Sequence, residues 1–408
     1  MENNKAFVAK LGNIQPIEGA DKIVKASVIL NDIAITNVVV GVESVEGQEI
    51  VYFDSNLCLS QRVLQDYPDL GNYLSKNGRV KVVKLRGTIS NGLAVEVAKF
   101  QKYLAKGTSL RHGDSFTELC SIPICSKYVA PIKLSTQSSK KGRNGKVESR
   151  MIPGQFNFHI DTDQLACNVH KLRPNIIVSI TSKLHGTSAI VSHCKVKKPR
   201  SFFGKLFNRP AQTEYDYIYA SRSVVKNGSA DGFYGHDIWT EAGEKFFKGK
   251  LYQGETVYYE IVGYLPSGAM IQKGYDYRNK PGSYSIAVYR ITKTGDDGHV
   301  VEYGWQAVKE RCAQLVVPHV PEYYFGGVDA FLPTDVDYNN PIWKSVMVDT
   351  LRAAFLEKDA DCDTKIPDEG IVLRVEGLGI EVYKLRSEKF FLHESKAHEE
   401  GSDIEEQS

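Results

Sequence analysis

The chain has 408 residues, of which 42% are hydrophobic and 25% are charged, values typical of soluble globular proteins with two or three domains. The net charge is only +2, so a site for a polyanion requires local clustering of lysine and arginine. Seven scattered cysteines form no Cys-x-x-Cys pair, which argues against a zinc site or a disulfide framework. No signal segment or membrane-spanning run is visible, so we expect a protein of the cytoplasm, or of the nucleus in a eukaryotic cell, without membrane contact.

Residues 1–125 are predicted to form a small β domain. Short apolar, β-branched runs broken by Gly, Asn and Asp indicate closely spaced strands, which favours a closed barrel. Two phrases, residues 17–23 (IEGADKI) and 84–93 (KLRGTISNGL), resemble the entry and exit of the tRNA-binding type of OB-fold. The resemblance implies an OB-like β-barrel, and both a structural barrel and one that contacts RNA directly remain open.

Three polar segments lie outside the predicted core. Residues 126–155 are predicted to be a linker, because 135–146 are basic and contain almost no apolar residue. Residues 195–210 interleave lysine and arginine with three phenylalanines, a composition that fits a hairpin tip or a contact with nucleic acid. Residues 391–408 are predicted to be an acidic, disordered tail.

Residues 156–390 are predicted to form the main domain, in which strands alternate with a few helices. Apolar residues recur at helical spacing in 305–315 and again in 343–354. Between the apolar strands 175–180 and 189–191 lies the turn Thr181-Ser182-Lys183-Leu184-His185-Gly186-Thr187-Ser188. A lysine on such a turn can serve as a nucleophile when its amine is neutral, and Gly186 allows a ligand to approach the backbone closely.

Chemically suggestive residues follow on later strands. Arg222 comes at the end of strand 217–223, and Glu260 interrupts the apolar strand 256–263, where a carboxylate needs a partner. Tyr289 adds an aromatic ring from strand 285–291. Glu369 and Gly370 open an apolar strand that continues through Val372. In the last strand, 381–387, Lys384 and Arg386 alternate and so share one face.

This ordered set resembles the motifs of covalent nucleotidyltransferases. The His-Gly-Thr of the first motif and residues 271–277 (IQKGYDY) resemble the nick-sealing branch of ATP-dependent RNA ligases. The preceding OB-like domain is similar to that of a subgroup of these enzymes. The resemblance implies an α+β protein, with an N-terminal OB-like barrel and an adenylyltransferase domain of antiparallel sheets with flanking helices.

The resemblance also implies roles for individual residues. Lys183 would attack the α-phosphate of ATP, and Glu369 would bind hydrated Mg²⁺ or Mn²⁺. Lys384 and Arg386 would neutralise the α-phosphate as charge develops. His185 and Gly186 would lie near the phosphates of the nucleotide, and Glu260 would contact the ribose. Arg222 would hold either the ribose or the incoming 5′-phosphate, and Tyr289 and Val372 would lie on the two faces of the adenine.

The implied function is the ATP-dependent joining of a 3′-hydroxyl to a 5′-phosphate in RNA repair. The substrates would be RNA ends, nicked duplex RNA or an RNA/DNA hybrid, and the enzyme would act as a monomer. Two positions depart from the usual motifs: Ser182 stands where relatives often have an acid, and Arg386 where lysine is common. A DNA ligase, a capping-type guanylyltransferase and a non-catalytic RNA-binding protein on a ligase scaffold remain alternatives. Because every residue assigned to lysine activation lies between 183 and 386, we expect the nucleotide pocket to be complete without the barrel.

Overall fold

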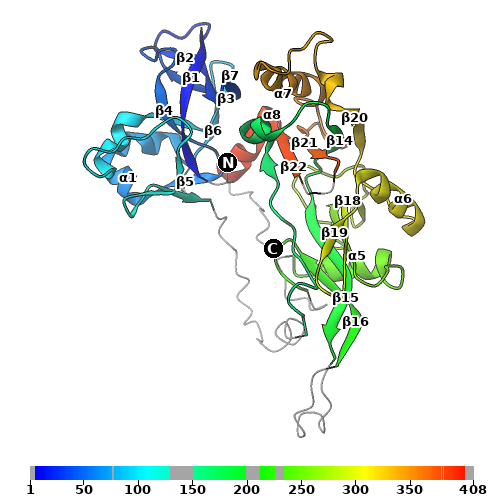
Figure 1. The fold of residues 1–408 in the computed structure, drawn as a ribbon. Coiled ribbons are helices and arrows are strands. Elements are labelled where there is room, and N and C mark those ends of the chain that lie inside the picture. Colours follow the sequence, from blue (N-terminus) through cyan, green and yellow to red (C-terminus); the bar gives the residue numbers. More distant parts are fainter. Residues whose placement is uncertain are drawn as a thin grey trace.

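The computed structural model describes residues 5–75, 78–128, 150–198, 212–226, 234–377, 379 and 381–399 (Figure 1). Most of the predicted linker and of the 195–210 insertion lies outside these residues. The described strands up to Lys127 pair only with one another, and those from Asp163 onward do the same. We therefore describe an N-terminal half and a C-terminal half, and the exact domain boundaries stay predictions.

The main sheet of the N-terminal half is antiparallel, with strand order β3-β2-β1-β4-β8 and β9 paired to the start of β1. Its strands are β1 (Ala6–Pro16), β2 (Ile23–Leu30), β3 (Ile33–Gly41), β4 (Glu49–Phe53), β8 (Leu93–Glu96) and β9 (Ser115–Phe116). Three two-stranded pairs are β5 (Leu57–Leu59) with β12 (Cys125–Lys127), β6 (Val82–Leu85) with β7 (Thr88–Asn91), and β10 (Glu118–Leu119) with β11 (Ile122–Pro123). The helical elements are α1 (Gln61–Asp66) and the 3-10 turns η1 (Pro68–Tyr73) and η2 (Val97–Tyr103). The OB-like identity of this half stays a prediction.

Strands β1 and β4 are apolar at consecutive positions because both of their faces are covered. In β4, Val51 and Phe53 point into a core within the N-terminal half. Ile50 and Tyr52 point the other way, into a core that also contains side chains of the C-terminal half. Since successive side chains of a strand face opposite sides, one short strand contributes to two cores.

The C-terminal half contains two five-stranded sheets, and only the pairing of β13 with β22 is parallel among their described strands. The first sheet, in order, is β13 (Asp163–Gln164), β22 (Glu381–Arg386), β21 (Gly370–Val375), β14 (Ile177–Ser182) and β20 (Glu322–Gly327). The second, in order, is β16 (Thr213–Ser221), β15 (Thr187–Lys197), β17 (Glu255–Gly263), β18 (Tyr284–Thr294) and β19 (Val300–Glu302). The fold is therefore mixed α+β, as the sequence predicts.

Helices flank these sheets: α3 (Leu165–Asn168), α5 (Ile238–Phe247), α6 (Trp305–Leu315), α7 (Ile342–Phe355) and α8 (Glu388–Glu399), with the 3-10 turns η3 (Val169–Lys171) and η4 (Val328–Phe331). The predicted helices at 305–315 and 343–354 are confirmed as α6 and α7. On α7, Trp343, Met347 and Leu351 recur every four residues and are buried, so one apolar stripe attaches the helix to the core.

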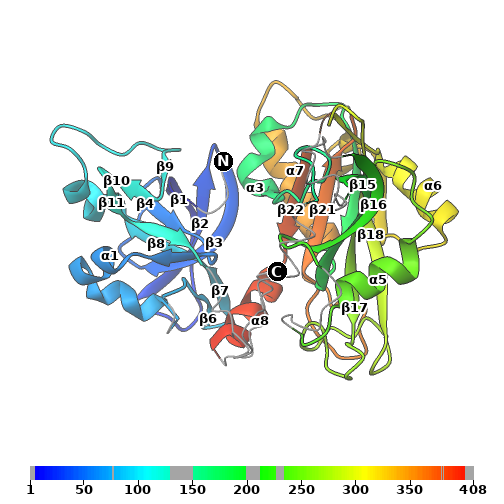
Figure 2. The same ribbon diagram turned by 90° about the horizontal axis from the view of Figure 1, so that it is seen from below.

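The prediction of a disordered tail from residue 391 is wrong for residues 391–399, which belong to α8. This helix packs against β6 and β7 of the N-terminal half (Figure 2). Arg79 is buried and forms an ion pair of 3.3 Å with Glu394, and the amide of Val82 donates to Ser395 Oγ at 3.1 Å. Buried Phe390 and Phe391 fix the start of the helix. Residues 400–408 lie outside the described part of the chain.

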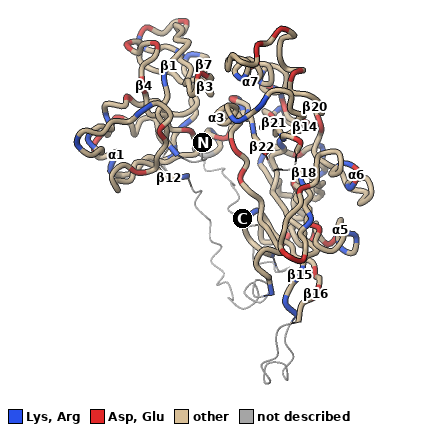
Figure 3. Tube along the Cα trace, viewed as in Figure 1, with Lys and Arg blue, Asp and Glu red and all other residues tan. Residues whose placement is uncertain are grey.

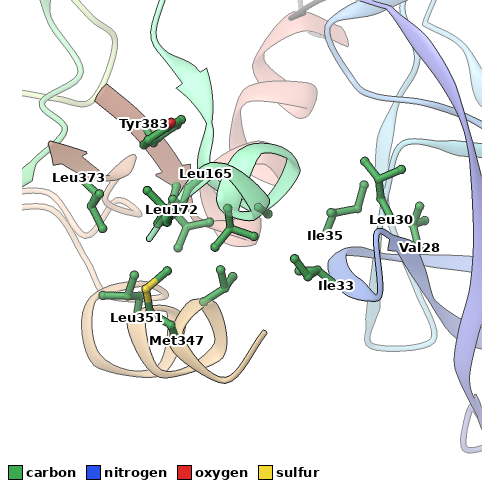
Figure 4. Close-up of a cluster of buried hydrophobic side chains, with 14 of the residues drawn as sticks. Val28, Leu30, Ile33, Ile35, Leu165, Leu172, Met347, Leu351, Leu373 and Tyr383 are labelled. Carbon is green, nitrogen blue, oxygen red and sulfur yellow. The ribbon is translucent and has the colours of Figure 1, made fainter. Parts of the chain in front are cut away.

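The two halves share one hydrophobic core. Figure 4 shows side chains of β2 and β3 facing those of α7 and of the segment around α3. The residues labelled there are Val28, Leu30, Ile33, Ile35, Leu165, Leu172, Met347, Leu351, Leu373 and Tyr383. At its edge, the Arg352 guanidinium donates to the carbonyls of Ala34 (3.0 Å) and Ile35 (2.7 Å). The contact between the halves therefore resembles a domain interior, with its polar backbone groups satisfied.

We predict that Leu351→Ala lowers the free energy of unfolding by about 2–5 kcal/mol, because it leaves a cavity in this shared core. Leu351 is fully buried, whereas Ile342 on the same helix is 61% exposed. Urea unfolding followed by circular dichroism measures both, with Ile342→Ala as the matched control and an expected change within about 0.5 kcal/mol. Equal, small effects of the two substitutions would contradict the buried interface.

Candidate active site

Lys183 lies at the junction of the two sheets of the C-terminal half. The chain leaves one sheet at Ser182, the end of β14, and enters the other at Thr187, the start of β15. The Lys183 amide donates to the carbonyl of Gly370 at 2.9 Å, which continues the β14–β21 pairing by one residue. The backbone therefore fixes where the lysine side chain starts.

Gly186 is required by close packing. A Cβ at this position would lie 2.4 Å from the carbonyl oxygen of Ile261, far inside van der Waals contact. The Gly186 carbonyl accepts a hydrogen bond from Gln272 Nε2 at 3.0 Å. Nearby, the amide of His185 donates to the hydroxyl of Tyr277 at 2.7 Å. The segment 271–277, singled out by its resemblance to RNA ligases, thus holds the turn that carries Lys183.

Glu369 connects the lysine and the histidine. Its Oε1 lies 2.7 Å from Lys183 Nζ, and its Oε2 lies 3.3 Å from His185 Nδ1. Burial alone would raise the pKa of Glu369, but Lys183 and His185 outweigh it, so the pKa lies below its ordinary value. A buried carboxylate therefore stays charged beside Lys183. Among the described residues, no group of three or more His, Cys, Asp or Glu side chains converges as a metal site.

A cavity of about 510 Å³ opens between the two sheets next to Lys183. It is lined by five residues that the sequence assigned to the site: Lys183, Arg222, Glu260, Tyr289 and Val372. The hydroxyls of Ser188 and Tyr289 are 2.9 Å apart, which fixes the tyrosine ring at the wall. The other assigned residues, namely His185, Gly186, Glu369, Lys384 and Arg386, do not line this cavity.

Lys384 and Arg386 reach the same region from β22, where they pair with Val372 and Gly370 of β21. Burial and, to a smaller extent, the neighbouring cations Arg386, Lys183 and Arg222 together lower the pKa of Lys384 to about 7. Arg386 lies over the ring of Phe391 at 4.3 Å, and its Nε is buried without a hydrogen-bond partner. Figure 3 shows Lys and Arg interspersed with Asp and Glu over both halves. The cations here therefore stand out by their convergence, which suits a phosphate group.

The sequence did not predict a cluster of three charged residues in the cavity wall, namely Arg290, Glu302 and Arg374. The Arg290 Nε contacts Glu302 at 2.9 Å, and Arg374 Nη1 contacts the same carboxylate at 3.4 Å. Arg290 lies within the predicted strand 285–291, and Arg374 lies two residues beyond Val372 on the strand that Gly370 opens, but neither belongs to the set of predicted site residues. Glu302 lies in no motif, and only the pairing of β19 with β18 brings it here.

The wall of the cavity includes residues that precede Lys183. All of its lining residues belong to the C-terminal half, so the completeness of the pocket without the barrel stays a prediction. The segment His159–Asp163 lines the cavity, and Asp161 pairs with Arg222. Asp161 also lies 3.7 Å from Lys127, at the end of β12 in the N-terminal half. No motif marks residues 159–163, since their position depends on contacts between segments far apart in the chain.

We predict a pH-dependent stability difference between the wild type and Glu260→Gln. The pKa of Glu260 is raised from 4.5 to about 7, chiefly by burial, with Lys183 opposing the rise and Glu369 adding to it. Between pH 4.5 and 7 the folded protein keeps a proton that the unfolded chain releases, so the wild type loses stability relative to the variant as pH rises. The slope is at most about 1.4 kcal/mol per pH unit.

Urea unfolding at pH 4.5 to 8 measures this difference, with Glu381→Gln, an exposed carboxylate at the rim of the same cavity, as the control. A difference between wild type and Glu260→Gln that stays constant from pH 4.5 to 7 would mean that the pKa of Glu260 is not raised in the folded protein.

No family model and no curated protein sequence matches the chain. Solved structures of a Naegleria gruberi RNA ligase are similar to it over nearly their whole length. A ligand-free variant has a TM-score of 0.63 at 17% identity, covering 97% of this chain and 100% of that chain. A variant with ATP and Mn has a TM-score of 0.62 at 18% identity, covering 95% and 98%. The form with PPi has a TM-score of 0.61 at 16% identity, covering 98% and 99%. The chain therefore has the fold of these RNA ligase structures.

Proposed function

We propose that this protein is an ATP-dependent RNA ligase that joins a 3′-hydroxyl to a 5′-phosphate through a lysyl-AMP intermediate on Lys183. The observation that carries the proposal is the position of Lys183, 2.7 Å from the buried Glu369 and at the wall of a cavity that holds Tyr289 and Glu260. The similarity to RNA ligase structures containing ATP or AMP with Mn supports the same chemistry.

In the first step, the Lys183 amine attacks the α-phosphorus of ATP, a P–N bond forms, and pyrophosphate leaves. Tyr289 and Val372 hold the adenine, and Arg222 and Glu260 hold the ribose. His185 and Gly186 lie beside the phosphates. Lys384 and Arg386 meet the negative charge that builds on the α-phosphate oxygens, where preorganised cations contribute most.

Glu369 fits the role of a metal-binding residue. It supplies a charged oxygen ligand, which Mg²⁺ or Mn²⁺ prefers, and a single carboxylate suits a cation that keeps its waters. A divalent cation held by Glu369 would supply positive charge next to Lys183, which would favour the neutral, nucleophilic amine. Glu369 Oε1 also lies 2.7 Å from Lys183 Nζ, so this carboxylate positions the lysine side chain as well.

In the second and third steps, AMP moves from Lys183 to the 5′-phosphate of RNA, and the 3′-hydroxyl then displaces AMP. We place the protein in the nick-sealing branch of RNA ligases, in the subgroup with an N-terminal OB-like domain. We propose that it acts as a monomer in RNA repair. Its substrates would be RNA ends, nicked duplex RNA or RNA/DNA hybrids. The contact of Lys127 with Asp161 supports a role of the N-terminal half close to the nucleotide. None of the described helices is long and apolar enough to cross a membrane.

We predict that Lys183→Ala abolishes covalent attachment of AMP, because the described cavity holds no second lysine bonded to Glu369. Intact-mass measurement after incubation with each of the four NTPs and Mg²⁺ gives both the attachment and the donor. Lys365→Ala, which removes a lysine that is 88% exposed, is the control and should label as the wild type does. AMP found on the Lys183→Ala protein would refute the assignment of the nucleophile.

We predict that Glu369→Gln lowers the rate of lysyl-AMP formation about 10- to 100-fold at limiting Mg²⁺, and that raising the Mg²⁺ concentration restores part of it. The physical reason is the loss of the carboxylate charge that attracts a hydrated cation. Single-turnover rates across a Mg²⁺ titration measure the effect. A loss of the same size at every Mg²⁺ concentration would instead mean that Glu369 only positions Lys183.

A further inference from the structure

The segment 156–163 crosses from one sheet of the C-terminal half to the other and forms a wall of the cavity. At its start, Phe156 is buried against the second sheet, and the hydroxyl of Tyr258 donates to the carbonyl of Asn157 at 2.9 Å. At its end, Asp163 pairs in parallel with Tyr383 of the first sheet. Both ends are therefore fixed, and the residues between them are held across the space where a nucleotide would lie.

His159 lies in this crossing with an unsatisfied polar atom. Its Nδ1 is buried and has no hydrogen-bond partner in the described structure. The ring packs against Tyr289, with centroids 5.4 Å apart and planes at 82°, and it lines the cavity. Buried polar groups are nearly always hydrogen-bonded, so an unpaired nitrogen at the wall of a cavity points to a ligand that pairs with it.

The imidazole is uncharged at neutral pH. Burial and, to a smaller extent, the guanidiniums of Arg222 and Arg290 together lower the pKa of His159 to about 3. A neutral imidazole has one nitrogen that donates and one that accepts. A hydroxyl group can pair with either nitrogen, whichever tautomer is present, and therefore matches this position.

The neighbours of His159 indicate which part of a bound nucleotide would lie beside it. The phosphates belong with Lys183, Lys384 and Arg386, since Lys183 must reach the α-phosphorus. Tyr289 offers its ring to the base. His159 contacts the Tyr289 ring and lies near enough to Arg222 and Lys183 to be affected by their charges, as expected of a residue beside the sugar.

We propose that His159 binds a hydroxyl of the ribose of the donor nucleotide, so that the cavity prefers ribonucleotides to the deoxy analogue that lacks this hydroxyl. The inference rests on the proposed function only in taking ATP as the occupant of the cavity. It assigns a substrate contact to a residue that lies outside every motif identified in the sequence.

The test is the binding of ATP, 2′-deoxy-ATP and 3′-deoxy-ATP, measured by calorimetry on proteins that also carry Lys183→Ala, so that bound nucleotide does not react. With His159 present, ATP should bind about three- to tenfold more tightly than one of the two analogues. His159→Phe keeps a ring against Tyr289 but has no nitrogen. It should therefore weaken the binding of ATP by the same three- to tenfold factor and leave the binding of the discriminated deoxy analogue unchanged. His159→Asn, which keeps a donor and an acceptor, should retain part of the preference.

His299→Phe, which replaces an exposed histidine, is the matched control, and circular dichroism with thermal melting confirms folding of each variant. The proposal would be overturned if His159→Phe weakened the binding of ATP and of both analogues equally, or if it did not weaken the binding of ATP.

The proposed function is tested separately by intact mass, using proteins that retain Lys183. If ATP binds with a preference that depends on His159 but no lysyl-AMP forms with Mg²⁺, the ribose contact stands and the ligase function fails. If lysyl-AMP forms equally well from ATP and from both deoxy analogues, the function stands and the ribose contact fails. If none of the three nucleotides binds, both are wrong.

Discussion

The ion pair between Lys183 and Glu369 depends on strand register. Ser182 pairs with Ile371 across β14 and β21, so the next residue on each strand brings Lys183 and Gly370 together, with Glu369 directly beyond. Gly370 has φ +139°, and a Cβ there would lie 2.2 Å from the carbonyl oxygen of Leu385. A shift of one strand by one residue would turn its side chains to the opposite face of the sheet and separate Lys183 from Glu369. Gly186 and Gly370 are therefore both needed for the backbone geometry that positions Lys183, because a side chain at either position would clash with a neighbouring strand.

The N-terminal half and the nucleotide pocket are physically connected. Lys127 reaches Asp161, which holds Arg222 at the cavity wall. On the opposite side, the shared core of β2, β3 and α7 fixes the orientation of the halves. The residues that line the cavity all belong to the C-terminal half, and the N-terminal half reaches its wall through the Lys127–Asp161 ion pair.

Local patterns in the sequence were sufficient to predict the strands and the motif residues they carry. The expected strand 256–263 is β17, and Glu260 lies within it facing the cavity. The helix at 305–315 could be predicted because its apolar spacing fits one face of a helix. His159 could not be found in this way, because its position is set by two anchors on different sheets. Helix α8 was missed because its sequence is polar, and it is held by contacts with β6 and β7 that no local pattern records.

The docking of α8 has a consequence for biosynthesis. Its partners in the N-terminal half lie very far back in the chain: 315 residues separate Arg79 from Glu394, and 351 separate Asn37 from Glu388. During translation the N-terminal half emerges and folds long before these residues exist, since domains generally fold as units as they are made. The Arg79 guanidinium can therefore form its ion pair with Glu394 only when synthesis of the chain is almost complete. A ribosome that stalled before residue 388 would hold a protein whose first half is folded but whose β6–β7 surface is still uncovered.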